Sequence, residues 1–162
     1  MVIVALVALV GPSNVGWSEA PKTKTVITSD KLTASNESNQ AVFQGSVKMV
    51  KDDMVVRSDM MIVYFKDKQP RKSQAGSTQE NSAKEIKLIE AKGRVRIAKG
   101  ESRAVAKHAL YFKDEEKVIL KGSPVAWQGG TRISGPKMTM FLKENRSVVE
   151  GGTKVIIEQP PE

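Results

Sequence analysis

The sequence contains no cysteine and only one histidine, His108, and these absences exclude several kinds of chemistry. Without cysteine the chain has no disulfide framework, no thiolate nucleophile and no zinc site with sulfur ligands. A metal site with several histidine ligands is excluded as well. Aromatic residues make up only 5% of the 162 residues, so the core of a folded domain has to be built mainly from Val, Ile, Leu and Met.

Sequence motifs of common enzyme classes are also missing. There is no Gly-x-Gly-x-x-Gly, no P-loop and no Gly-x-Ser-x-Gly. His108 follows a lysine and is typical of a surface residue near the start of a strand. The pairs Ser29-Asp30 and Ser58-Asp59 precede apolar runs, where turn hydrogen bonds explain them better than acid–base catalysis. We therefore expect a protein without enzymatic activity, bound cofactor or metal.

The chain has one long hydrophobic run, residues 1–10, which is followed by small and polar residues. About 20 apolar residues are needed for a helix to cross a bilayer, so this run predicts a secretory signal peptide. We expect it to span residues 1–20, with cleavage near Ser18 or Ala20, and to direct a single domain of residues 21–162 to a Gram-negative periplasm. An uncleaved membrane anchor and a buried strand are the alternatives.

Positive charge exceeds negative charge, with 26 Lys and Arg against 18 Asp and Glu and a net charge of +8. Such an excess favours an anionic partner or surface. Nucleic acid is disfavoured by the predicted export and by the lack of aromatic residues among the basic ones, on which bases could stack. Anionic lipid or the phosphates of lipopolysaccharide fit the expected compartment better.

Glycine recurs at a fixed place in an internal repeat. Gly93, Gly122 and Gly151 are 29 residues apart, and Gly45 lies 48 residues before Gly93. The longer interval coincides with residues 67–85, which are rich in Lys, Gln, Ser and Asn and predict an inserted polar loop or hairpin tip. A glycine inside an otherwise regular strand indicates a bulge, a sharp bend or a close backbone approach.

Around each glycine the pattern indicates β-strands. Val47 and Met49 alternate with Lys48, and Val95 and Ile97 alternate with Arg94 and Arg96, as expected for strands with one buried face. Charged or glycine-containing turns follow, at residues 51–53, 99–101, 113–116, 128–130 and 143–146. Pro124 interrupts the third copy and predicts a bulge or an edge strand there. The sequence thus predicts an all-β fold of about four strand–turn–strand repeats.

Several segments resemble the OstA-like repeat of the LptA family of periplasmic lipopolysaccharide-transport proteins. They are residues 27–32 (Ile-Thr-Ser-Asp-Lys-Leu), 43–47 (Phe-Gln-Gly-Ser-Val), 56–61 (Val-Arg-Ser-Asp-Met-Met) and 144–152 (Glu-Asn-Arg-Ser-Val-Val-Glu-Gly-Gly). The resemblance covers roughly residues 25–158. It implies a V-shaped, twisted antiparallel β-jelly-roll that is open at both ends.

The resemblance further implies a carrier that shields the lipid A acyl chains of lipopolysaccharide in an apolar groove. It also implies end-to-end strand pairing, both between copies in head-to-tail self-association and with other components of the transport machinery at the inner and outer membranes. Adaptable Met side chains suit such a groove. The residues expected to line it are Phe43, Val47, Met49, Met61, Val63, Val95, Ile97, Leu110, Phe112, Met138 and Met140.

Two alternatives remain at this stage. One is a membrane-anchored, LptC-like member of the same machinery, which would keep an N-terminal transmembrane helix. The other is a structural β-repeat protein without lipid cargo, whose apolar residues would form only a packed core. The facing of the second strand of each repeat also stays open, and with it the facing of Met61, Val63, Leu110, Phe112, Met138 and Met140.

Overall fold

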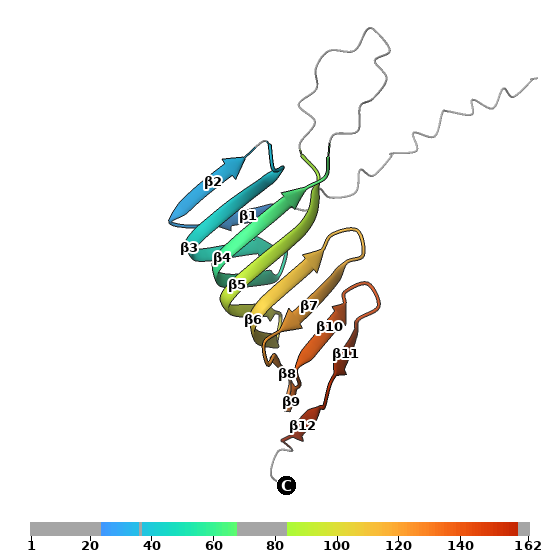
Figure 1. The fold of residues 1–162 in the computed structure, drawn as a ribbon. Coiled ribbons are helices and arrows are strands. Elements are labelled where there is room, and N and C mark those ends of the chain that lie inside the picture. The colour runs from blue at the N-terminus through green and yellow to red at the C-terminus, as the bar shows by residue number, and fades with distance from the viewer. Residues whose placement is uncertain (1–23, 36, 68–83, 159–162) are drawn as a thin grey trace, which may run out of the picture.

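The computed structural model describes residues 24–35, 37–67 and 84–158, whose strands form one antiparallel sheet that is not closed (Figure 1). The expected signal peptide and nearly all of the 67–85 insertion lie outside these residues. The strands of the described part are β1 (Thr25–Thr28), β2 (Lys31–Ser35), β3 (Gln40–Lys51), β4 (Met54–Phe65), β5 (Ile86–Lys99), β6 (Ser102–Phe112), β7 (Lys117–Lys121), β8 (Val125–Gln128), β9 (Thr131–Ser134), β10 (Lys137–Phe141), β11 (Arg146–Glu150) and β12 (Lys154–Ile157). This arrangement confirms the expected all-β fold.

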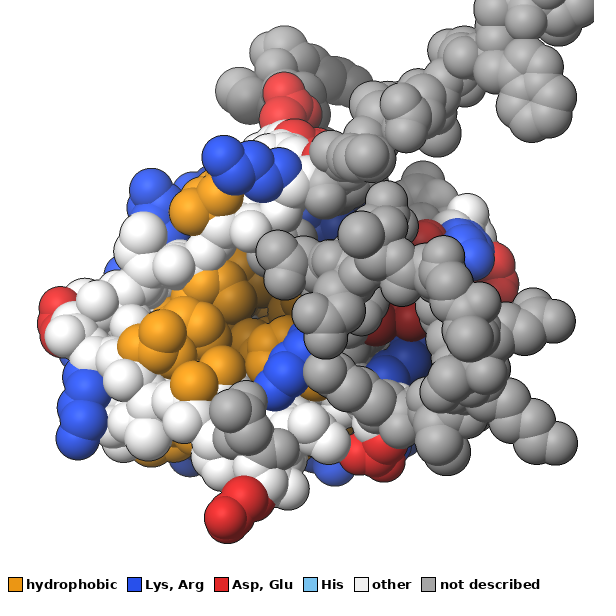
Figure 2. Space-filling model, turned by 90° about the horizontal axis from the view of Figure 1, so that it is seen from above, with side chains coloured by type: hydrophobic (Ala, Val, Ile, Leu, Met, Phe, Trp, Pro, Cys, Tyr) orange, Lys and Arg blue, Asp and Glu red, His pale blue; other side chains and the backbone are white. Residues whose placement is uncertain are grey.

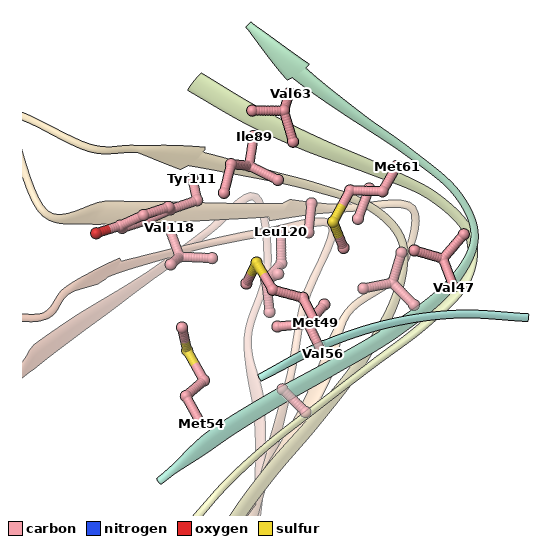
Figure 3. Close-up of a cluster of buried hydrophobic side chains, with 14 of the residues drawn as sticks. Val47, Met49, Met54, Val56, Met61, Val63, Ile89, Tyr111, Val118 and Leu120 are labelled. Carbon is pink, nitrogen blue, oxygen red and sulfur yellow. The ribbon is translucent and has the colours of Figure 1, made fainter. Parts of the chain in front are cut away.

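Four long strands, β3 to β6, run through two layers and bend where the layers meet. Layer 1 combines one half of each long strand with β2, β7, β10 and β11, and layer 2 combines the other halves with β1, β8, β9 and β12. The two layers diverge from the bend as the arms of a V, with side chains from both arms pointing into the space between them (Figure 3). The strands follow one another from the β1 and β2 end to the β12 end.

The repeated glycine forms the corner of this V in every copy. The strand register shifts between Gln44 and Val47, between Arg57 and Met60, and between Lys92 and Val95. Each glycine and the residue after it have positive φ, from Gly45 and Ser46 (77° and 45°) to Gly151 and Gly152 (83° and 98°). The predicted bulge is therefore present. It bends the long strands along one line, where layer 1 meets layer 2.

Glycine is also required because the neighbouring strand passes close to each corner. A Cβ on Gly45 would collide with the Asp30 side chain, and one on Gly93 would collide with the Asp59 side chain. Next to Asp59, the Ser58 hydroxyl donates a hydrogen bond to the Met60 carbonyl (2.9 Å). The turn bonding predicted for the Ser-Asp pairs thus comes from the serine here, and the aspartate packs against the glycine.

Later in the chain the same corner becomes a break between strands. Gly122 and Ser123, followed by the buried Pro124, separate β7 in layer 1 from β8 in layer 2. Because proline cannot donate a backbone hydrogen bond, the strand ends here instead of bending through. The sequence predicted a bulge or an edge strand at Pro124, whereas the structure has a break between two strands that each pair on both sides.

The core lies between the two layers. Its largest fully buried hydrophobic side chains include Met61, Leu120 and Met138 from layer 1 and Val47 and Val95 from the corner. No described buried side-chain nitrogen or oxygen lacks a hydrogen-bond partner. The interior is thus aliphatic and rich in Met, as the shortage of aromatic residues required.

One carboxylate, Glu90, joins three strands on the outer face of layer 1. Its oxygens accept hydrogen bonds from the Tyr64 hydroxyl (3.1 Å) and contact His108 Nε2 (2.7 Å) and Lys92 Nζ (3.2 Å). Burial alone would raise the pKa of Glu90, but the hydrogen bonds from Lys92, His108 and Tyr64 together outweigh burial and lower the pKa below its ordinary value of 4.5.

Replacing Gly93 with Ala should destabilise the domain by about 1–3 kcal/mol, because the new Cβ meets Asp59 and the backbone keeps a positive φ. Gly100→Ala is the control, since Gly100 also has a positive φ (55°) but has nothing within 4 Å of an added Cβ. The free energy of unfolding of both variants is measured by urea denaturation, followed by circular dichroism. If Gly93→Ala loses no more free energy of unfolding than Gly100→Ala does, the close approach between Gly93 and Asp59 is contradicted.

Replacing Glu90 with Gln should lower the free energy of unfolding at neutral pH by about 1–2 kcal/mol. Because the pKa of Glu90 is lowered in the folded state, its contribution is present above pH 4.5 and is lost as pH falls through the folded-state pKa. In urea denaturation at a series of pH values, the difference in free energy of unfolding between the wild type and Glu90→Gln should therefore shrink below about pH 4. Glu101→Gln, in an exposed turn, is the control, and an unchanged difference at low pH would rule the explanation out.

Candidate functional site

The inner faces of the two layers form one continuous apolar wall. In layer 1 a row of paired residues runs from Leu32 through Phe43 and Met61 to Val149, and in layer 2 a row runs from Ile27 to Val155. Each row crosses the molecule from one edge to the other. The wall is therefore shared by every repeat and belongs to no single strand.

Nine of the eleven residues expected to line a groove belong to this wall. They are Phe43, Val47, Met49, Met61, Val63, Val95, Ile97, Met138 and Met140. The structure brings them together because residues that are register partners point to the same side of a sheet. The positions of these side chains test the expected facing; whether they bind a ligand is a separate question.

The expected inward facing of Leu110 and Phe112 is wrong. Their neighbours Ala109 and Tyr111 belong to the core, so the intervening residues of β6 point outward. Leu110 lies between Glu90 and Ile119 on the outer face, and Lys117 lies 4.9 Å from the centre of the Phe112 ring. The corner bulge shifts the alternation in the middle of each long strand, and the parity beyond it could not be read from the sequence.

Other wall residues were missed by sequence reasoning. They are Met54, Val56, Ile89, Ala91, Ala104, Tyr111, Val118, Leu120, Ala126 and Ile133. The facing of the alanines cannot be predicted from the sequence, because a small side chain is compatible with either face of a sheet. Ile89 could have been found by counting alternation separately on each side of Gly93 in β5. Met54, Val56 and Tyr111 lie on β4 and β6, which contain no glycine to mark the corner.

The space between the layers is tight in one half and open in the other. Beside β3 to β6, side chains including Met49, Met54 and Met61 leave a gap of only about 20 Å³. Beside β8 to β11 a cavity of about 240 Å³ remains, and its apolar lining includes Ile97, Met138 and Met140. Small side chains at Ala104 and Ala126 leave this part of the interior unfilled.

The mouth of the cavity is polar and positively charged. Lys99, Ser102 and Arg103 line it from layer 2, while Asn145 and Arg146 line it from layer 1. An apolar interior below a cationic rim suits an amphipathic molecule with an acidic head and a hydrocarbon tail.

Among the described residues, one polar contact spans the opening between the layers beside the tight half. Lys51 Nζ on β3 donates a hydrogen bond to the Tyr111 hydroxyl on β6 (3.1 Å) and lies 5.2 Å from the centre of its ring. Lys51 belongs to the layer 2 half of its strand and Tyr111 to the layer 1 half. This contact holds the two arms of the V together across their open side.

At one end of the sheet the apolar wall is visible from outside. Seen from the end that carries β1 and β2, hydrophobic side chains gather in a hollow with Lys and Arg around it (Figure 2). The four exposed large hydrophobic residues are Val26 on β1, Leu32 on β2, and Val155 and Ile157 on β12. All four lie on strands that pair on one side only within the described sheet.

The basic residues Lys48, Arg94 and Arg96 lie outside the groove. Lys48 and Arg96 are in register with Arg57 on the outer face of layer 2. Arg94 pairs with Asp59 (Nη2 to Oδ1, 2.6 Å), and the hydrogen bonds from Arg94 lower the pKa of Asp59. The basic residues at the groove mouth are instead Lys99, Arg103 and Arg146.

Within residues 24–35, 37–67 and 84–158, no group of three or more His, Asp and Glu side chains could hold a metal ion. The same residues contain no helix with the length and hydropathy that a membrane crossing requires. His108 contacts Glu90 on the outer face, away from the cavity.

Comparisons with known proteins agree with this geometry. Residues 26–146 match the family described as LptA/(LptD N-terminal domain) LPS transport protein. The fold is similar to the crystal structure of LptH, the LptA homologous periplasmic component of the conserved lipopolysaccharide transport device from Pseudomonas aeruginosa. The TM-score is 0.69 at 10% sequence identity, over 84% of this chain and 96% of that chain. At this identity the likeness shows the fold alone.

No curated protein sequence matches the chain significantly. The family match nevertheless extends over most of the sequence, and the fold agrees with the β-jelly-roll that the corner glycines and register shifts build. The chain therefore belongs to the LptA and LptD N-terminal family of lipopolysaccharide transport proteins.

Proposed function

We propose that this protein is a periplasmic carrier and bridge for lipopolysaccharide, and that it holds lipid A acyl chains between its two layers. The observation that carries the proposal is the cavity of about 240 Å³, lined by Ile97, Met138 and Met140 below a rim of Lys99, Arg103 and Arg146. Acyl chains need an apolar wall, and lipid A phosphates need cations at its edge. No enzymatic activity is part of this proposal.

The Met side chains suit a flexible cargo. Met49, Met54 and Met61 fill the tight half of the space, and unbranched Met side chains change rotamer more readily than Val or Ile. Acyl chains entering from the open half would displace these side chains without moving the strands. A structural β-repeat protein without cargo, the alternative from a different class, would keep them packed.

The exposed apolar edges support assembly end to end. Leu32 begins the inner row of layer 1, and Val155 and Ile157 lie at the end of the inner face of layer 2, where they are 56%, 51% and 68% exposed. A further strand at either edge would cover them and satisfy the free backbone groups. Because the two edges differ, pairing one with the other gives an open, head-to-tail assembly of copies or of related partners at the two membranes.

Photo-crosslinking in cells tests the cargo. A photoreactive residue at Ile97 or Met140 should form adducts with lipopolysaccharide, because both line the cavity. Leu110 and its register partner Ile119, which face outward on layer 1, are the matched controls and should give none. The absence of adducts at every position in a folded, exported protein would overturn the carrier proposal and favour the structural alternative. Equal adducts at Leu110 would indicate surface adsorption.

Assembly through the edges is tested by Ile157→Lys, with Ile156→Lys as the control on the opposite face of the same strand. Ile157 is 68% exposed, so a charge there leaves the isolated domain folded but opposes burial under a neighbouring strand. Light scattering over a concentration series should show a lower average mass for Ile157→Lys only. Unchanged assembly in Ile157→Lys would argue against pairing at this edge.

A further inference from the structure

A row of unpaired cations covers the outer face of layer 2, on the opposite side of the sheet from the cavity. Lys48, Arg57 and Arg96 are in register on β3, β4 and β5. On the next three strands of this face, β6, β8 and β9, Arg103 and Arg132 flank Trp127, their common register partner. All five cationic residues are exposed.

This row lacks counter-charges. Among the described residues, no carboxylate forms a salt bridge or hydrogen bond with the side chains of Lys48, Arg57, Arg96, Arg103 or Arg132. The neighbouring Arg94, by contrast, is held by Asp59. Like charges directly opposite each other on adjacent strands repel, so the arrangement weakens the sheet until an anion neutralises it.

The same residues line two adjoining hollows. One, of about 430 Å³, is lined by Arg57, Arg96, Arg103 and Trp127 over an aliphatic floor. The other, of about 370 Å³, is lined by Lys48, Arg57, Arg96 and, at its margin, the Arg94–Asp59 ion pair. Arg57 and Arg96 belong to both. The hollows thus form one trough across the strands.

We propose that this trough, the basic face of layer 2, docks the protein onto an anionic lipid surface by binding phosphate headgroups. Guanidinium groups bind phosphate oxygens in pairs, and six strands at about 4.8 Å spacing present them over a width of roughly 24 Å, enough for several headgroups. Trp127 supplies the amphipathic ring that favours the headgroup region. The trough lies on the opposite face of layer 2 from the cavity and shares Arg103 and Trp127 with its margin. Lys48, Arg57 and Arg96 supply positive charge that does not line the cavity.

Vesicle co-sedimentation tests the proposal with the full chain. Vesicles of phosphatidylglycerol in phosphatidylcholine are compared with vesicles of phosphatidylcholine alone, so that binding through the apolar residues 1–10 contributes equally to both. The triple variant Lys48→Gln, Arg57→Gln, Arg96→Gln, at positions that do not line the cavity, should lose at least about tenfold in binding to the anionic vesicles. Binding by the wild type should fall as salt rises.

The control triple variant is Lys87→Gln, Lys121→Gln, Lys143→Gln, which removes the same charge from exposed positions of layer 1 and its turns. It should bind nearly as well as the wild type. Equal losses in both triple variants would show an effect of net charge only and would overturn the proposal. Because all six side chains are exposed, circular dichroism should show both variants folded.

Trp127 provides a readout specific to this face. In a Trp17→Phe background it is the single tryptophan, and its emission should shift to the blue on anionic vesicles. An unchanged emission on bound vesicles would place another surface against the lipid and refute the proposal. Binding of inorganic pyrophosphate or of polyglutamate without binding of anionic vesicles would likewise refute it, by assigning the trough to free phosphate or to an acidic protein.

Discussion

The close approach of backbones at the corner of the V is the constraint on which the rest of the structure depends. At Gly45 and Gly93 the chain takes a positive φ and passes directly beside an aspartate of the neighbouring strand. Only glycine leaves room for this, so each repeat bends at the same place and the bends align across the sheet. Because they align, two inner faces oppose each other over the whole length of the molecule, and a continuous apolar space follows from one local geometry.

Layer 2 presents a different chemical environment on each of its two faces. Ile97 and Ala104 of layer 2 face the cavity, while their chain neighbours Arg96 and Arg103 face solvent. Strand alternation makes this separation automatic. The inner face supports the proposed transport of lipid acyl chains, and the outer face is free to meet an anionic surface. Arg103 and Trp127, which border both spaces, are the residues that the two sites share.

An open sheet leaves apolar residues at its ends, and these ends differ from each other. Leu32 at one edge and Ile157 at the other remain uncovered because no further strand follows them in the described part. In a monomer such edges would favour uncontrolled association. In a protein that extends by adding strands, they become the sites at which the apolar wall continues from one unit to the next.

Much of the fold and part of the groove could be predicted from the sequence alone. The 29-residue spacing of glycine, the alternation of Val47 and Met49 with Lys48, and the charged turns established an all-β repeat, because side-chain periodicity and turn chemistry are local properties. Nine of the eleven residues expected to line a groove belong to the wall, and the alternation itself predicted the facing of Val47, Met49, Val95 and Ile97. The resemblance of the repeat segments to the LptA family supplied the V shape, which local patterns do not contain.

The tertiary structure decided the rest. The bulges shift the alternation within each long strand, so Leu110 and Phe112 face outward although they belong to an apolar run. The position of the cavity depends on Ala104 and Ala126, whose small size matters only because they lie opposite larger side chains across the gap. The row of Lys48, Arg57 and Arg96 comes from three strands, and register brings distant residues together only when the sheet forms. Composition and periodicity are properties of the linear sequence. Side-chain facing, cavities and charge clusters depend on which strands pair and in which register, and that pairing exists only in the folded molecule.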